Sequence, residues 1–171
     1  MTTTSYENYP IRIVVLSGAI AFSIYAIGTF ILAGFGILIA ALYVLYCLGV
    51  ELAILKGSCV HCYYYGKVCS FGRGKLCALF FKRGDPQNFL RRQISWKEIL
   101  PDLLVALVPL LGGIALLIRE FSWIVAGAMV VLVLLSFGGN ALVRGSFACK
   151  FCKQRELGCP AEKLFSQSRA A

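Results

Sequence analysis

The sequence predicts an all-α integral membrane protein with four transmembrane helices, arranged as two parallel helical-hairpin repeats with a cysteine-rich cytoplasmic cap. Three observations lead there: 59 % of the 171 residues are apolar and the mean hydropathy is +0.79, two long apolar stretches are present, and one cysteine pattern occurs twice. A chain this short cannot hide so much apolar surface in one core in water. A soluble globular enzyme is therefore excluded.

The first apolar stretch runs from Ile11 to Leu55, and only Arg12 and Glu51 interrupt it. A transmembrane helix needs about 20 residues, so two helices fit. The break falls at residues 33–36, where two glycines permit a tight reversal of the chain. Residues 1–55 are therefore expected to form an N-terminal tail and a first hairpin.

The second apolar stretch covers residues 99–143, and Arg119-Glu120 divides it into two further segments of spanning length. Ser95 followed by Glu98 is typical of a capping box, which puts the start of the third helix near Trp96. Residues 99–143 are therefore the second hairpin. Residues 56–98 and 144–171 are the basic, cysteine-rich segments that follow the two hairpins.

The orientation follows from the positions of the 17 lysines and arginines. Four crossings put both termini and residues 56–98 on one face of the membrane, and all the basic residues except Arg119 lie on that face. Basic residues favour the cytoplasmic side. We expect a protein of the cell (cytoplasmic) membrane whose termini and cysteine-rich segments lie in the cytoplasm.

Six of the eight cysteines form two triplets with the same spacing, C-x2-C-x6-C. Each triplet follows a hairpin and a short basic-Gly-Ser junction, at residues 56–58 and 144–146. Because each hairpin crosses the membrane twice, the halves are expected to be parallel repeats that bring both triplets to one face. The first triplet is Cys59, Cys62 and Cys69, and the second is Cys149, Cys152 and Cys159.

Metal binding is the favoured chemistry for these cysteines, since the cytoplasm keeps thiols reduced and a C-x2-C turn can aim two thiolates at one ion. One grouping uses Cys59, Cys62, Cys69 and Cys77 as one site and leaves the second triplet in need of an outside ligand, for which His61 is a weak candidate. The other grouping surrounds one ion with the two C-x2-C pairs. The repeated third cysteine favours the first grouping.

The cofactor suggested by such ligands is zinc or an iron–sulfur cluster, because thiolate-rich sites accept both. A membrane haem held by two histidines is excluded, since the chain has one histidine.

Within the predicted spans, three polar groups stand out. Cys47 and Glu51 share a face of the second helix, and Asn140 lies at a similar depth in the fourth. Glu51 is expected to bond to Asn140 or to snorkel; a proton or ion relay is the alternative.

The expected partner is a bilayer with anionic headgroups. Residues 76–81 are rich in leucine and phenylalanine and are flanked by Lys75, Lys82 and Arg83, a pattern typical of a short interfacial helix. The tyrosines at 63–65 are expected at the headgroup boundary. No nucleic-acid partner is expected, because the bilayer accounts for both the charge and the rings.

The leading functional hypothesis is membrane-linked electron transfer through cytoplasmic metal sites, with a soluble redox protein or a membrane complex as partner. The alternatives are a zinc-stabilised membrane anchor that recruits acidic partners or lipids, and a membrane thiol-disulfide oxidoreductase. The charge bias argues against the oxidoreductase, since it puts these thiols on the reducing side. A transporter is a fourth hypothesis, which rests on Glu51 and the repeat. The sequence contains no Ser/His/Asp set or paired carboxylates that would identify an enzyme.

Overall fold

The computed structural model describes residues 5–91 and 96–160, and the described residues are mostly helical. Their contacts divide the chain into two compact units. Unit 1 draws on residues 1–18, 52–95 and 143–171, and unit 2 draws on residues 19–51 and 96–142. The two cysteine triplets and the segment before the first helix therefore belong to the same unit.

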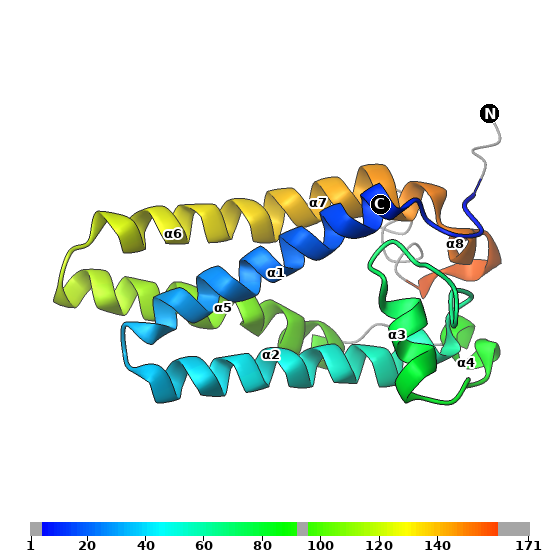
Figure 1. Cartoon of the computed structure of the whole chain (residues 1–171), viewed down its shortest axis with the longest axis horizontal. Helices are drawn as coiled ribbons and strands as arrows, with labels where there is room; N and C mark the ends of the chain where they lie inside the picture. The colour runs from blue at the N-terminus through cyan, green and yellow to red at the C-terminus, as the bar shows by residue number, and fades with distance from the viewer. Residues whose placement is uncertain (1–4, 92–95, 161–171) are drawn as a thin grey trace. The chain divides into compact units, whose positions relative to one another are not determined.

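The first two long helices form the predicted hairpin (Figure 1). Helix α1 spans Ile11–Ala33 and α2 spans Ile37–Gly57. Gly36 in the turn has φ of 121°, a value that glycine adopts far more easily than residues with a Cβ. The predicted break at residues 33–36 is confirmed.

The second pair begins with α5, which spans Trp96–Arg119, and continues after a short turn with α6, Trp123–Val133. The helix then widens into π-helical turns at Leu134–Gly139 and Val143–Ala148, on either side of α7, Asn140–Leu142. The predicted break at residues 119–120 is confirmed. The predicted start near Trp96 coincides with the point where the described residues resume, and it stays a prediction. Ser95, the proposed N-cap, lies outside the described residues.

Four helices in the described residues are long and apolar enough to cross a membrane: Ile11–Ala33, Ile37–His61, Glu98–Arg119 and Trp123–Phe151. Their large side chains are widely exposed; Ile37, for example, is 84 % exposed. Such surfaces suit a lipid environment. The chain is therefore an all-helical protein consistent with membrane localisation.

Small residues bring helices of unit 2 close together. A Cβ added to Gly113 of α5 would lie 2.5 Å from the sulfur of Met129, and one added to Gly112 would lie 2.8 Å from Leu32. Close approach of this kind increases packing between helices in lipid, where the hydrophobic effect does not drive association.

A buried tyrosine supplies a hydrogen-bond donor that the backbone of α5 lacks. Pro109 has no N–H, so the carbonyl of Val105, four residues earlier, lacks its helical donor. The hydroxyl of Tyr43 donates to that carbonyl at 2.7 Å, and Tyr43 is only 4 % exposed. Gly28 leaves space for the ring, because a Cβ there would lie 2.4 Å from the tyrosine oxygen.

We expect Tyr43→Phe to destabilise the protein by about 1–2 kcal/mol, because the Val105 carbonyl would be left without a donor in an apolar setting. Thermal unfolding in detergent measures the effect. The matched control is Tyr46→Phe, which removes a 2.8 Å bond to the Pro101 carbonyl. That carbonyl keeps a helical donor, so the control should cost less; equal losses would contradict the explanation.

Unit 1 contains shorter elements around the cysteines. In the first cysteine-rich segment these are a 3₁₀ turn η1 (Cys59–His61), α3 (Arg73–Phe80) and α4 (Pro86–Arg91). In the second they are a 3₁₀ turn η4 (Cys149–Phe151) and α8 (Lys153–Gly158). Leu55, Val60 and Cys77 form a small apolar core in this unit.

Candidate metal-binding cysteine cluster

The two C-x2-C motifs adopt the same local structure. In each, the N–H of the second cysteine donates to the carbonyl of the first at 3.3 Å, in Cys59–Cys62 and again in Cys149–Cys152. Each second cysteine then turns to extended backbone and its carbonyl accepts an N–H from three residues on, at 3.1 Å for Cys62 and 3.0 Å for Cys152. The identical spacing is thus matched by an identical pair of turns.

Backbone N–H groups point at the sulfur atoms. Cys62 accepts a hydrogen bond from the N–H of Tyr64, and Cys152 accepts one from the equivalent N–H of Gln154. Gly74 donates its N–H to the sulfur of Cys69 at 3.4 Å. Such bonds favour the thiolate over the thiol, and thiolate is the form that binds metals.

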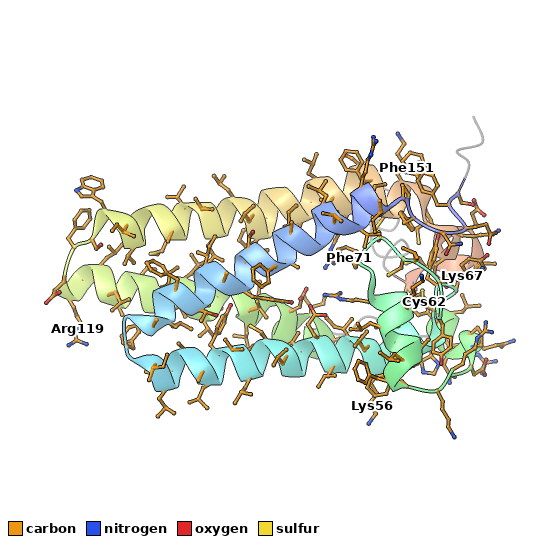
Figure 2. All side chains as sticks on the ribbon, viewed as in Figure 1. Lys56, Cys62, Lys67, Phe71, Arg119 and Phe151 are labelled. Atoms are coloured by element: carbon orange, nitrogen blue, oxygen red, sulfur yellow. The ribbon has the colours of Figure 1, made fainter. Side chains whose placement is uncertain are left out.

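Two hydrogen bonds tie the cysteine-rich segments to each other directly after these cysteines. The N–H of Tyr63 donates to the side-chain oxygen of Gln154 at 2.7 Å, and the N–H of Lys153 donates to the Tyr64 hydroxyl at 3.0 Å. Gln154 is 5 % exposed and Tyr64 is 2 % exposed, so both bonds are sheltered. Cys62 and Cys152 are therefore brought close to each other, and Figure 2 shows Cys62 in the same region as Phe151.

The segment before α1 lies across both cysteine-rich segments. Tyr6 donates its N–H to the carbonyl of Phe151 at 3.0 Å, and Tyr9 donates its N–H to Val68 at 2.9 Å. The Tyr9 hydroxyl also bonds to the carbonyl of Ala148. We call residues Tyr6–Tyr9 the N-terminal strap, because they connect the segments that carry the two triplets.

Glu7 in the strap is paired with one lysine from each cysteine-rich segment. Its carboxylate forms ion pairs with Lys67, at 3.1 Å, and with Lys153, and it accepts a hydrogen bond from Tyr63. Lys153, Tyr63 and Lys67 lower the pKa of Glu7 from 4.5 to about 2. The side chain is exposed, so water and salt screen these attractions.

The sign of this shift predicts a pH dependence. A carboxylate whose pKa is lower in the folded state stabilises that state above the unfolded pKa and loses this contribution as the pH falls. The wild type should therefore unfold at a higher temperature than Glu7→Gln at pH 7, and the gap should close between pH 4.5 and about 2. Thermal unfolding of both proteins across this range tests it; a gap unchanged at the acid end would contradict the assignment.

The thiols of the two triplets are close enough to influence each other. Burial raises the pKa of Cys62 to about 11; the Tyr64 N–H opposes this, and the neighbouring thiols of Cys152, Cys69 and Cys159 add to it. Burial also raises the pKa of Cys152. Without a cation, these sulfur atoms favour the neutral form.

The remaining sequence-predicted ligands lie in different settings. Cys77 is completely buried, and its thiol donates to the carbonyl of Leu55 at 3.6 Å. Cys149 is exposed. His61 contacts the Asp85 carbonyl through Nδ1 at 2.9 Å and packs closely on Gly84.

All eight cysteines are free thiols. Within residues 5–91 and 96–160, no set of three or more Cys, His, Asp or Glu side chains is arranged to hold a metal ion. Cys62, Cys69, Cys152 and Cys159 thus form a neighbourhood of thiols rather than a closed coordination shell.

The polar groups predicted within the candidate spans lie in unit 2. Glu51 accepts a hydrogen bond from the Tyr25 hydroxyl at 2.5 Å, a partner that the sequence analysis missed. Asn140, the expected partner, donates to the carbonyl of Ser136 in its own helix at 3.2 Å. Cys47 is buried.

Sequence reasoning also missed the residues that join the two triplets. Tyr64 is buried and bonds to the strap through the Tyr6 carbonyl at 2.6 Å, a contact that the predicted headgroup position did not include. Neither Glu7 nor Gln154 belongs to a sequence motif that would have singled it out. An acidic residue in an otherwise uncharged N-terminal segment was the one available signal for Glu7.

Comparison of the chain with protein-family models, with curated proteins and with solved structures gave no match.

Proposed function

We propose that this chain is an integral membrane protein whose two cysteine-rich segments together hold one thiolate-ligated metal centre on the cytoplasmic side. The observation that carries the proposal is the pair of matching C-x2-C turns, held side by side through Tyr63–Gln154 and Tyr64–Lys153. Because the two turns lie next to each other, they can supply thiolates to one ion from two sides, as a tetrahedral site requires.

The proposed ligands are Cys62, Cys69, Cys152 and Cys159. This set takes ligands from both triplets, because Cys62 lies near Cys152 and Cys159 of the second triplet as well as Cys69 of its own. Cys77 suits the role of a core residue, since it is 0 % exposed among apolar neighbours. Closing the set around an ion requires the cysteine side chains to turn toward a common point.

The donor chemistry is consistent with zinc or an iron–sulfur cluster. Amide N–H groups at Cys62, Cys152 and Cys69 can stabilise the negative charge that thiolates carry around a metal. The expected cytoplasmic position keeps the thiols reduced and available, which supports metal binding over disulfide exchange.

Electron transfer between a soluble partner and a membrane carrier is the proposed use if the centre is an iron–sulfur cluster. If the centre is zinc, the same site is a structural staple of a membrane anchor. The Glu7 ion pairs with Lys67 and Lys153 are consistent with this second candidate, because they join the same two segments that a structural zinc ion would join.

Metal analysis of protein purified in detergent without oxygen tests the proposal. We expect about one zinc ion or one cluster per chain. Visible absorption that bleaches on reduction would favour electron transfer, and zinc without a chromophore would favour the anchor. Protein with intact thiols that neither retains nor takes up zinc or iron would overturn the proposed function.

A further inference from the structure

Helix α3 packs beside the ends of two of the candidate membrane spans. At its start, a Cβ added to Gly72 would lie 3.2 Å from Val14, in the first turn of α1. In its middle, the thiol of Cys77 donates to the carbonyl of Leu55, near the last residues of α2. In Figure 1, α3 accordingly lies against the end of α2. These contacts put α3 where the spans leave the bilayer, whichever way the protein faces.

The side of α3 away from these contacts is apolar and uncovered. Leu76 is 50 % exposed, Leu79 is 76 % exposed and Phe80 is 65 % exposed, whereas Gly74 and Cys77 are buried. An exposed apolar surface outside the spans is unfavourable in water.

Basic residues flank this apolar surface in the sequence and lie at the start of α3. Lys75, Lys82 and Arg83 flank it in the sequence. Two guanidinium groups also lie over the ring of Phe71, just before the helix: Arg73 at 5.5 Å and Arg144 at 5.6 Å from the ring centre. Figure 2 labels Phe71. An apolar surface bordered by cations matches the chemistry of an anionic leaflet, with acyl chains beneath phosphate groups.

We propose that α3 is an interfacial helix, with Leu76, Leu79 and Phe80 inserted among acyl chains and the surrounding basic residues bound to anionic phospholipid headgroups. The bilayer is favoured over a partner protein for two reasons. The contacts with Val14 and Leu55 already hold the helix at the membrane boundary, and the bordering charge is complementary to anionic lipid. This inference does not depend on a metal being bound.

Tryptophan fluorescence tests the position of α3. In a background of Trp96→Phe and Trp123→Phe, Leu79→Trp provides a single reporter, and the high exposure of Leu79 makes it a mild change. The full chain is reconstituted in vesicles of phosphatidylcholine and phosphatidylglycerol. Lipids brominated on their acyl chains should quench the emission strongly, and aqueous acrylamide should quench it weakly. Phe80→Trp, on the same face, should behave in the same way and serves if the first variant does not fold.

The opposite pattern, strong acrylamide quenching without bromine quenching, would overturn the proposal. Shielding from both quenchers that increases with the protein-to-lipid ratio would indicate a second copy as the occupant, and would also overturn it. Replacing Lys75, Lys82 or Arg83 with glutamine should each reduce partition of α3 into the anionic leaflet roughly fivefold. In vesicles of phosphatidylcholine alone, the glutamine substitutions should not change the bromine quenching of the reporter tryptophan. In vesicles that contain phosphatidylglycerol, equal bromine quenching with and without the basic residues would refute the anionic preference.

Discussion

Replacing either Cys62 or Cys152 with serine should remove most of the bound metal from the whole protein. If both residues hold the same ion, as we propose, the loss of one thiolate opens the coordination shell and weakens binding by orders of magnitude. Structural thiolate sites bind zinc with apparent free energies of about 10–16 kcal/mol, so this loss should also lower the unfolding temperature. Metal per chain after gel filtration, together with thermal unfolding, measures both effects.

The pattern across the variants separates a shared centre from independent ones. Two independent sites would lose about half of the metal in each variant, which would contradict sharing but not metal binding. The matched control is Cys47→Ala, which removes a buried thiol in unit 2 and should keep the metal content of the wild type. Cys77→Ala tests the assignment of that residue to the core: it should lower stability and leave the metal bound.

Gly74→Ala should be among the most destabilising single-methyl changes in the protein. A Cβ at this position would lie 2.2 Å from the carbonyl oxygen of Tyr64 and 2.4 Å from that of Lys67. Both atoms belong to the backbone, so the clash can be relieved only if α3 or the loop moves. We expect a loss of about 3 kcal/mol, at the upper end of the usual cost of overpacking. The shift would also remove the N–H of Gly74 from the sulfur of Cys69.

Thermal unfolding and metal retention of Gly74→Ala, beside Gly18→Ala, check this expectation. Gly18 lies in α1 with nothing within 4 Å of an added Cβ, so alanine there should leave stability unchanged or raise it by roughly 0.5–1 kcal/mol. Equal stability of the two variants would mean that the backbone around Gly74 can shift at little cost in free energy. The close packing of α3 on residues 64–67 would then contribute little to the stability of the protein.

The sequence by itself determined the four apolar helices and their turns. The length of an apolar run, set against the thickness of a bilayer, is a local property that can be read one segment at a time. The reversal at Gly36 is equally local, since φ of 121° depends on the residue itself. The repeated cysteine spacing likewise predicted where thiols would gather, although not which of them would be neighbours.

Only the tertiary structure decided how the two triplets meet. Tyr64 and Lys153 are 89 residues apart, and Tyr63 and Gln154 are 91 residues apart, yet their hydrogen bonds align Cys62 with Cys152. Glu7 and Lys153 are 146 residues apart. No local pattern encodes such pairings, because the free energy of each contact depends on the whole of unit 1 having folded around it. For the same reason only the tertiary structure shows that Tyr64 is buried within unit 1 and that Cys77 lies in its apolar core.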